Sequence, residues 1–414
     1  MISLRTFQVP VGDKKIIFIP MLKKLFLVNN DVHIPDFVRS ADIPKEYRLL
    51  PDYKFKAVQL IVNNGCNLRC IYCYTNAGTQ GFIEIPFETA KVAIDKVISD
   101  IQTLGLDTIE VNFIGGEPTL SLRLIRRIIT YLKDECRKTG LKSRIGIVTN
   151  GVFSSSVADF IINHFDYVTV SIDGDKQIHD THRPMASGRG SFKTVFANAK
   201  RLYDSGIAFG PRATVSTLSV DKILEIVRFL HSHFPNSIIG IEPLQECDRC
   251  FTTDTHRPDP MTFARNFIKA LVFAHREDVR IKNSIIRFHS RTEGISFCGA
   301  NGQNFGITPD GYVTACTRVT SSHDKMANFF CYGRVDPDQE KITFFPEVYE
   351  RLKSLVVDNI SACKDCFARF NCKGDCPISK ADFSPDFRLQ PSNRCEANKY
   401  ITKNLFMLQL GLLD

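Results

Sequence analysis

The sequence predicts an α/β protein built around a parallel β-sheet. Six short apolar runs have the composition of buried strands, and five segments with helical periodicity alternate with them. Because strand–helix–strand units place successive strands in parallel with right-handed crossovers, this order predicts a parallel sheet between residue 57 and about residue 245. A doubly wound sheet and a barrel both fit the alternation. In either architecture the functional site lies at the carboxyl ends of the strands.

The expected strands are 58–63, 108–114, 144–149, 166–172, 208–216 and 237–242. The expected helices are 87–104, 120–138, 155–164, 191–205 and 219–233, and Ser191 is expected to cap the fourth of them. Residues 260–290 are expected to form a long amphipathic helix and a connecting segment.

The first 57 residues form a separate, smaller segment. Two apolar runs, 14–20 and 24–29, predict a β-hairpin joined by residues 21–23, and the Pro- and charge-rich stretch 31–52 predicts a linker or covering loop. We expect this ribbon to cap the following domain. The alternative is a docking element, because an exposed strand edge can pair with an extended peptide.

The length and amino-acid composition of the chain argue against a membrane-spanning or an exported protein. The 414 residues allow two or three domains, and the contents of 43% hydrophobic and 24% charged residues are ordinary for a globular chain. No apolar run reaches the ~18–20 residues of a membrane span, and the first residues lack the features of a signal peptide. We therefore expect a cytoplasmic protein whose 14 cysteines serve as metal ligands rather than as disulfides. The scattered net charge of +8 predicts neither nucleic-acid nor membrane binding.

Three cysteines directly after the first expected strand carry the strongest chemical signal. Cys66, Cys70 and Cys73 have the spacing CxxxCxxC. Thiolates are the preferred ligands of iron–sulfur clusters, and three of them on a four-iron cluster leave one iron able to bind a small molecule. A zinc loop or three free thiols are the alternatives. The second strand ends in the turn Gly115-Gly116-Glu117-Pro118.

A second set of cysteines lies in the last third of the chain. Cys298 and Cys316 flank a turn at residues 309–311, which predicts that one hairpin carries both thiols. Four more cysteines follow within 14 residues, and then a last one; they are Cys363, Cys366, Cys372, Cys376 and Cys395. The first four lie among Lys, Arg and Gly residues with little capacity to form a core, so this segment is expected to need a metal to fold. Zinc is the alternative to iron here.

Together these motifs resemble the radical S-adenosylmethionine (radical SAM) superfamily with a C-terminal SPASM auxiliary-cluster domain. Within it, the chain is similar to maturases of ribosomally synthesised peptides (RiPPs) and to anaerobic sulfatase-maturating enzymes. The resemblance implies a partial (β/α)6 TIM-type barrel with a small N-terminal β appendage. It also implies three 4Fe-4S clusters, S-adenosylmethionine, a precursor peptide, and a reducing partner such as flavodoxin or ferredoxin. The implied domains are 1–56, 57–290 and 291–414.

The resemblance also assigns roles to residues. Tyr72 would lie against the adenine, the Gly-Gly-Glu turn would hold the methionine amino group, and Arg183 would bind the methionine carboxylate. The full expected set around the cofactor is Tyr72, Gly115, Gly116, Glu117, Pro118, Asn150, Ser171, Asp173 and Arg183, with Ser171 and Asp173 near the ribose. Arg212 is a second candidate for the carboxylate, and the alternative for Arg183 is an exposed loop position.

In the resemblance the C-terminal cysteines divide into two clusters. The outer cluster would use Cys363, Cys366, Cys372 and Cys395, and the inner one Cys298, Cys316 and Cys376. The inner cluster then has an open iron, or takes a fourth ligand from Cys331, Cys247 or Cys250. Functionally, we expect a peptide maturase that forms a thioether or a carbon–carbon cross-link.

Two other functions stay open. The first is formylglycine generation by an anaerobic sulfatase-maturating enzyme. Those relatives carry an aspartate after the second auxiliary cysteine and commonly a tryptophan before the Gly-Gly-Glu turn, whereas here Thr317 and Arg318 follow Cys316 and the chain has no tryptophan. The second is a non-catalytic zinc-ribbon scaffold.

Overall fold

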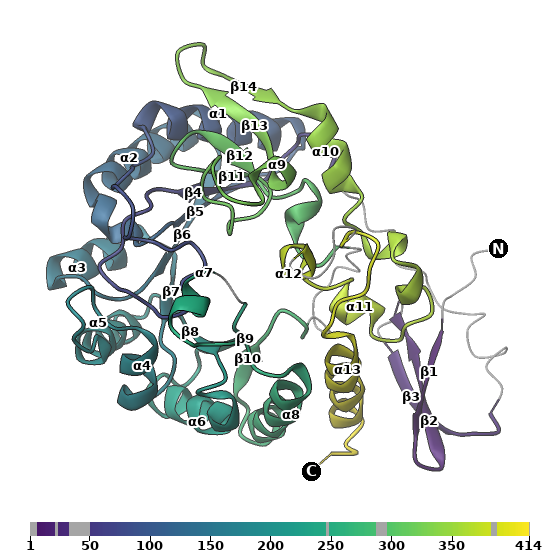
Figure 1. The fold of residues 1–414 in the computed structure, drawn as a ribbon. Coiled ribbons are helices and arrows are strands. Elements are labelled where there is room, and N and C mark those ends of the chain that lie inside the picture. Colours follow the sequence, from purple (N-terminus) through teal and green to yellow (C-terminus); the bar gives the residue numbers. More distant parts are fainter. Residues whose placement is uncertain are drawn as a thin grey trace.

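The structure is a computed structural model that describes residues 6–20, 24–32, 50–245, 248–286, 296–381 and 387–413. Within these ranges it consists of one curved sheet of eleven strands, helices packed on the outer face of that sheet, and a separate sheet of three strands (Figure 1). The large sheet has the order β10-β9-β8-β7-β6-β5-β4-β11-β12-β13-β14.

Seven neighbouring strands of the large sheet are parallel. They are β4 (Ala57–Ile61), β5 (Thr108–Ile114), β6 (Lys142–Thr149), β7 (Tyr167–Ser171), β8 (Ala208–Val215), β9 (Ile238–Pro243) and β10 (Arg280–Lys282). The first six confirm the expected strands. The seventh lies in the segment expected to be a connection, because a three-residue strand is too short to show a periodic pattern. The sheet confirms the partial barrel.

Helices connect the strands, and most of them cover the outer face of the sheet (Figure 1). They are α1 (Phe87–Thr103), α2 (Leu122–Thr139), α3 (Ser155–His164), α4 (Lys176–His182), α5 (Phe192–Asp204), α6 (Ile223–His233), α7 (Asp248–Thr252) and α8 (Pro260–Arg276), with 3-10 turns η2 (Pro118–Ser121) and η3 (Val220–Lys222). All five expected helices of the alternating region are present, and α8 is the expected long amphipathic one.

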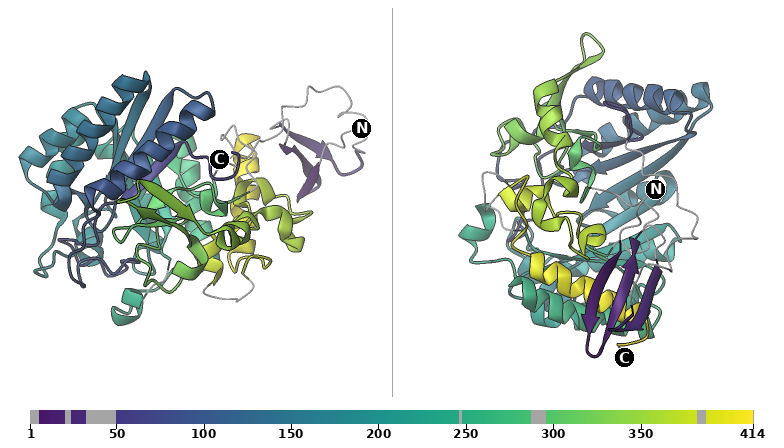
Figure 2. Two further views of the ribbon diagram at one scale, coloured as in Figure 1. Left: turned by 90° about the horizontal axis from the view of Figure 1, so that it is seen from above. Right: turned by 90° about the vertical axis from the view of Figure 1, so that its right-hand side faces the viewer.

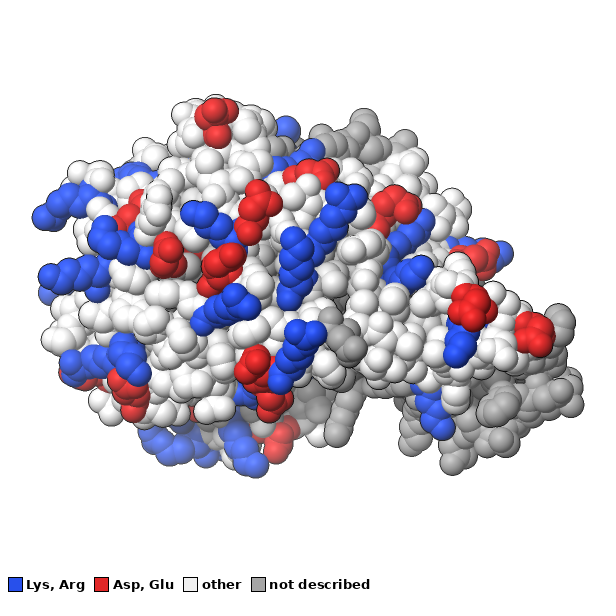
Figure 3. All heavy atoms as spheres, turned by 90° about the horizontal axis from the view of Figure 1, so that it is seen from below, with Lys and Arg blue, Asp and Glu red and all other residues white. Residues whose placement is uncertain are grey.

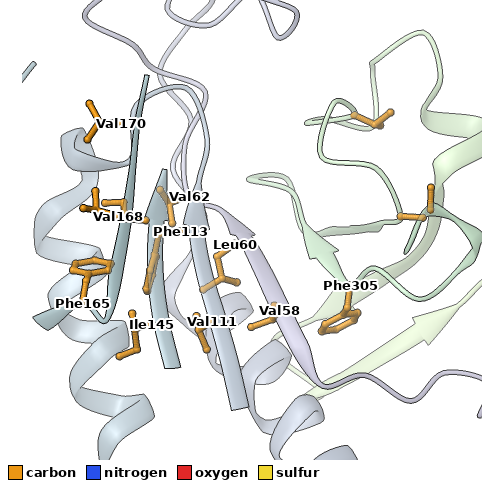
Figure 4. Close-up of a cluster of buried hydrophobic side chains, with 14 of the residues drawn as sticks. Val58, Leu60, Val62, Val111, Phe113, Ile145, Phe165, Val168, Val170 and Phe305 are labelled. Atoms are coloured by element: carbon orange, nitrogen blue, oxygen red, sulfur yellow. The ribbon is translucent and has the colours of Figure 1, made fainter. Parts of the chain in front are cut away.

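The main core lies between the sheet and these helices. Strand side chains alternate between the two faces of a sheet, and in β5 the buried Val111 and Phe113 point to the core (Figure 4). The other face of β5 is polar: Tyr167 of β7 donates hydrogen bonds from its hydroxyl to Glu110 and Asn112. The barrel therefore has an apolar outside under the helices and a polar inside.

The C-terminal third closes the open side of the barrel (Figure 1). Strand β11 (Gly306–Ile307) pairs in parallel with β4, and β12 (Tyr312–Thr314), β13 (Cys331–Asp336) and β14 (Lys341–Phe344) extend the sheet antiparallel. The hairpin β11–β12 confirms the turn expected at residues 309–311. Helices in this part are η4 (Gly299–Asn301), α9 (Ala327–Phe330), α10 (Pro346–Lys353), η5 (Val357–Asn359), η6 (Ser361–Cys363), α11 (Arg369–Cys372), α12 (Pro377–Ala381) and α13 (Cys395–Gln409). Helix α13 packs along α8, at the far edge of the barrel (Figure 2).

The N-terminal segment forms the small sheet β1 (Phe7–Val11), β2 (Lys14–Ile19) and β3 (Lys24–Asn29). The expected hairpin is β2–β3, and β1 was not expected because it contains Pro10; an edge strand tolerates proline, and β1 lies at an edge. The ribbon was expected to cap the barrel, the next domain along the chain. Instead, Phe7 packs on Phe370 and Phe18 on Phe406, so it covers the C-terminal region. Most of the expected linker 31–52 lies outside the described residues.

Charge is mixed on the surface. Lys and Arg side chains lie among Asp and Glu on the face drawn in Figure 3, in keeping with the modest net charge. Among the described residues, no helix combines the length and the apolar content that crossing a membrane requires.

One buried carboxylate fastens the segment before β4 to the barrel. Asp100 of α1 is 1% exposed, and it accepts hydrogen bonds from the Lys54 ammonium at 3.1 Å and the Phe55 amide at 3.1 Å. Lys96, one turn earlier on α1, donates to the same carboxylate at 2.5 Å. Phe55 is thereby held against Phe305, which belongs to the C-terminal third.

We expect Asp100→Ala to lower the free energy of unfolding by about 2 kcal/mol. Removing one partner of a buried ion pair costs ~3–5 kcal/mol, but both lysines here are partly exposed and solvent screens the interaction. Urea unfolding followed by circular dichroism would measure the difference. The exposed carboxylate of Asp107 is the control, and equal effects of Asp107→Ala and Asp100→Ala would contradict the prediction.

Candidate functional site

Three thiols lie together where β4 ends. Cys70 is buried, and Cys66 and Cys73 are half-buried, in one cluster that also contains Tyr72 and Leu244. Burial raises the pKa of Cys66 to about 11 and that of Cys70 to about 12, and the charges of the neighbouring thiols add to both shifts. We refer to Cys66, Cys70 and Cys73 as the first thiol group. The loop thus brings together the three cysteines that the spacing predicted.

Two arginines fix the loop that carries the first thiol group. Arg69 donates to the carbonyls of Cys66 and Leu68 at 2.9 and 2.8 Å. Arg249 of α7 is buried and donates to the Cys70 carbonyl at 3.3 Å and the Ala77 carbonyl at 3.2 Å. Sequence reasoning missed Arg249, since no pattern distinguishes it from other arginines. The same helix buries Cys250 against the first thiol group, while Cys247 lies outside the described residues.

The two glycines after β5 allow that strand end to touch the cysteine loop. A Cβ on Gly115, whose φ is +155°, would lie 2.7 Å from the Asn63 carbonyl oxygen, and one on Gly116 would lie 2.0 Å from the Gly65 carbonyl oxygen. The amides of Gly116 and Glu117 instead donate to these carbonyls at 2.9 and 2.7 Å. Only glycine permits this approach. The two glycines therefore bring the end of β5 into direct contact with the cysteine loop.

Glu117 joins the ends of β5 and β6. Its carboxylate is fully buried and accepts hydrogen bonds from the Thr119 hydroxyl at 2.7 Å, the Thr149 hydroxyl at 2.8 Å and the Asn150 amide at 2.7 Å. Burial raises its pKa above the ordinary value. Pro118 follows as the first residue of η2. The Asn150 side-chain amide in turn donates to the Cys66 sulfur at 3.5 Å, so this network ends on a thiol.

Asp173, which follows β7, is the centre of a second buried network. Its carboxylate is 0% exposed and accepts from the Tyr72 hydroxyl, from His182 Nδ1 at 3.1 Å and from the Thr214 amide at 3.0 Å. Burial alone would raise the pKa of Asp173, but Arg183 and His182 hold it well below its usual range. The carboxylate is therefore ionised and enclosed by protein donors. Ser171, the other residue expected near the ribose, is half-buried at the end of β7.

Arg183 is buried beside the first thiol group. Its Nε lies 3.1 Å from the Asp173 carboxylate, and its Nη1 lies 3.8 Å from the Cys70 sulfur. The alternative of an exposed loop arginine is therefore wrong. Ser191 was expected to cap helix α5 but makes no capping bond; its hydroxyl donates to the Arg183 carbonyl at 2.5 Å and pairs with His179. Tyr72 is buried between Arg183 and His182, with the guanidinium 5.2 Å from its ring centre.

Arg212, the second candidate, is an exposed residue of β8. It is the register partner of Ser171 in β7, and its carbonyl accepts a hydrogen bond from the Ile172 amide at 2.9 Å, so its backbone lies beside Asp173. Tyr74 directly follows Cys73, and the Arg318 guanidinium lies 5.7 Å from the centre of its ring, so Tyr74 joins the cysteine loop to the C-terminal third.

The C-terminal cysteines form two further groups. Cys316 is influenced by the charges of Cys376 and Cys298, and its pKa rises to about 12, chiefly through burial. We refer to these three as the inner thiol group. Cys363 is influenced by Cys395 and Cys366, and Cys372 by Cys395 and Cys363. These four make up the outer thiol group. The structure thus brings the seven cysteines together in the two groups that the resemblance implied, and their role as cluster ligands stays a prediction.

Two candidates for a fourth inner ligand lie elsewhere. Cys331 is buried at the start of β13, and the groups that act on it are Asp310, Asp324 and Thr314. Cys250 packs with the first thiol group. In the described part of the chain, no three Cys, His, Asp or Glu side chains converge on a point suited to one metal ion.

The surroundings of the thiols fit iron–sulfur clusters. Hydrogen bonds to the sulfurs are a common feature of cluster ligands and tune their potentials. Here the Cys66 sulfur accepts from the Leu68 amide at 3.4 Å, and the Cys372 sulfur accepts from the Asn398 side-chain amide at 3.1 Å. With the Arg183 contact to Cys70, both the first and the outer thiol group have donors directed at sulfur, and such donors stabilise a thiolate.

Comparison with known proteins identifies the barrel. Residues 60–230 match the model of the Radical SAM superfamily. An uncharacterized protein of Methanocaldococcus jannaschii is 33% identical over 42% of this chain and 58% of its own length. The radical SAM cyclopropyl synthase TigE of Paramaledivibacter caminithermalis is 25% identical over 71% of this chain and 64% of its own. The chain thus spans about three fifths of the length of these two relatives.

Solved structures share the fold over most of the chain. The structure of anSMEcpe with bound AdoMet has a TM-score of 0.68 at 19% identity, over 86% of this chain and 98% of its own. Streptococcus suis SuiB bound to the precursor peptide SuiA has a TM-score of 0.57 at 13% identity, over 83% of this chain and 76% of its own. Both likenesses extend beyond the barrel into the C-terminal third. The segment that carries the first thiol group therefore matches the radical SAM superfamily, and the chain is similar over most of its length to SPASM-type members of that superfamily.

Proposed function

We propose that this protein is a radical SAM peptide maturase that forms a thioether or a carbon–carbon cross-link in a ribosomally synthesised peptide. The observation that carries the proposal is the division of ten cysteines into three separate groups, one at the barrel mouth and two in the segment that closes it. When bound, the clusters and S-adenosylmethionine supply reductive cleavage of the cofactor and a 5′-deoxyadenosyl radical that takes a hydrogen atom from the peptide.

The chain's own residues would bind and orient the cofactor. We assign the methionine carboxylate to Arg183, because a buried guanidinium beside Cys70 can form charge-assisted hydrogen bonds with it. Glu117 and Asn150 would order the strand ends around the amino group, with Gly115, Gly116 and Pro118 shaping the turn. Tyr72 and Ser171 would border the adenosine. We assign Asp173 a positioning role, since protein donors already surround its carboxylate.

A thioether is the product that we favour. The inner thiol group has three cysteines, so a cluster there would leave one iron open to a soft ligand. A substrate thiol bound at that iron would lose its proton. Loss of a hydrogen atom from the peptide carbon, formation of the sulfur–carbon bond and transfer of one electron to the cluster then balance the reaction.

The second candidate is a sulfatase-maturating enzyme, which the higher TM-score and fuller coverage of anSMEcpe favour. Thr317 and Arg318, after Cys316, argue against it, because that position lacks the aspartate general base of those relatives. The two functions give different products: formylglycine is an aldehyde that hydrazides label, and a thioether is not.

We further propose that residues 1–56, 57–290 and 291–414 are the three domains, with the first covering the last.

The iron content of the protein tests whether each of the three thiol groups holds a cluster. The anaerobically reconstituted protein should hold about twelve irons per chain, at four per cluster, and the variant with Cys66, Cys70 and Cys73 replaced by Ala should hold about eight. Iron and acid-labile sulfide analysis measures both. A wild-type content near four would remove the auxiliary clusters from the proposal, and a colourless protein that holds zinc would support the scaffold alternative.

Arg183→Gln should weaken S-adenosylmethionine binding by about ten- to a hundredfold, because a hydrogen bond to a charged group contributes ~1.5–3 kcal/mol. Equilibrium binding to the unreduced protein gives the dissociation constant, and release of 5′-deoxyadenosine after reduction should fall as well. The control is Arg189→Gln, in the same segment but exposed. Iron content should match the wild type in both variants. Unchanged affinity in Arg183→Gln would place the carboxylate elsewhere.

Adding a cysteine-containing precursor peptide to the oxidised protein should change the spectrum of the inner cluster, because the substrate thiolate would bind its open iron. The same peptide with Ser in place of Cys is the control and should leave the spectrum unchanged. After turnover, the Cys peptide should have lost the mass of two hydrogens. An unchanged spectrum, together with loss of inner-cluster iron in Cys247→Ala or Cys331→Ala, would show that the chain itself supplies the fourth ligand.

A further inference from the structure

A buried asparagine from the last helix faces the outer thiol group. Asn398 is 1% exposed, and its side-chain nitrogen, Nδ2, donates to the Cys372 sulfur at 3.1 Å. Helix α13 begins at Cys395, another cysteine of the same group, and residues three apart on a helix lie on one face. Asn398 therefore lies beside two thiols of the outer group, one through a direct hydrogen bond and the other through the helix.

The sulfur decides how the Asn398 amide is oriented. Among the residues that the structure describes, the Asn398 oxygen, Oδ1, is buried and has no hydrogen-bond partner. An unpartnered buried polar atom costs ~1–3 kcal/mol. An asparagine that only fills the core would have partners at both ends of its amide. Here the N–H group faces the sulfur and the oxygen is left unsatisfied, so the contact with Cys372 is maintained at a cost to stability.

Burial strengthens the contact between Asn398 and Cys372. The neighbours of Asn398 on the same face of α13, Ala397 and Ile401, are buried, and Cys372 is buried as well. A hydrogen bond is electrostatically stronger where water is excluded, because the local dielectric is lower. The charge of any group bound through Cys372 is therefore felt strongly by the Asn398 amide.

We propose that Asn398 raises the reduction potential of the outer cluster by donating to Cys372. The inference rests on the proposed function, which assigns the outer thiol group to a cluster, and it makes Asn398 a positioning residue that acts through a ligand. Reduction adds one electron, and part of the added negative charge lies on the sulfurs. An N–H donor therefore stabilises the reduced state more than the oxidised one.

In the proposed reaction, this electron is the one that formation of the sulfur–carbon bond releases to the inner cluster. Only three residues separate Cys372 from Cys376 of the inner thiol group. The outer cluster is then the next acceptor of the electron, and a raised potential favours the transfer.

A redox titration followed by electron paramagnetic resonance (EPR) tests the proposal. Asn398→Leu and Asn398→Asp are close to asparagine in size and cannot donate from a side-chain amide. They are made in the full chain with Cys66, Cys70 and Cys73 replaced by Ala, so that the first cluster gives no signal. At the potential where the outer cluster with Asn398 is half reduced, the ratio of reduced to oxidised cluster should fall about fivefold in Asn398→Leu. It should fall further in Asn398→Asp, which adds negative charge.

The matched control is Asn404→Leu. Asn404 lies on the same helix, but its side-chain amide donates to the Tyr400 carbonyl at 2.8 Å and not to a sulfur. Its replacement should leave the potential of the outer cluster unchanged, and the potential of the inner cluster should stay the same in every variant. An outer-cluster potential in Asn398→Leu and Asn398→Asp equal to that of Asn404→Leu would overturn the proposal.

A second measurement needs no variant to fold. The wild type is labelled with 15N in the side-chain amides of asparagine, and pulsed EPR of the reduced protein should show a 15N coupling to the outer cluster. Asn398→Leu should remove this coupling, and Asn404→Leu should keep it. A wild type that holds the outer cluster without a 15N coupling would overturn the proposal, even if both replacements of Asn398 lost the cluster.

The proposed function fails independently of this inference. A protein that cleaves S-adenosylmethionine and modifies its peptide, but whose outer cluster has no 15N coupling, would keep the function and remove the role of Asn398. A coupled outer cluster in a protein that never releases 5′-deoxyadenosine would support the role of Asn398 and remove the function.

Discussion

The burial of the Asp173 carboxylate is the constraint on which the site depends. A charge removed from water is stable only when donors replace the lost hydration. Those donors come from three separate parts of the barrel: Tyr72 from the cysteine loop, His182 and Arg183 from the end of α4, and Thr214 from β8. Satisfying one carboxylate therefore fixes the position of the first thiol group relative to the strands beside it. Glu117 does the same for the ends of β5 and β6, and its network reaches the Cys66 sulfur through Asn150.

These two carboxylates also explain how a short cysteine loop is ordered by its surroundings. The loop buries Leu68 and Tyr72 in a small apolar cluster, and Arg69 and Arg249 donate to its backbone carbonyls, which would otherwise lose hydrogen-bond partners. The close approach of Gly116 to the Gly65 carbonyl supplies another direct contact. The loop is thus held by side chains from the sheet, from α7 and from its own residues. The thiols keep their relative positions through these contacts and through the small apolar cluster that Leu68, Tyr72 and Leu244 form around them.

The sequence predicted the elements better than their mutual contacts. The six strands and five helices of the barrel could be predicted because alternation and helical periodicity are local properties, and the cysteine groups because their spacings are short or matched. Strand β1 and strand β10 could not, since one contains a proline and the other has three residues. The burial of Arg183, the role of Arg249 and the position of the N-terminal ribbon on the C-terminal third depend on contacts between residues far apart in the chain. A single sequence contains no local signal for such contacts.

The closure of the barrel holds the inner thiol group in a fixed position relative to the cysteine loop. Because β11 continues the sheet from β4 while α13 packs on α8, the C-terminal third is attached to both edges of the open barrel. The inner thiol group therefore lies on the same side as the cysteine loop. Arg318, two residues after Cys316, lies over the ring of Tyr74, which follows Cys73. A separate module on a flexible linker could not hold two thiol groups at one fixed separation.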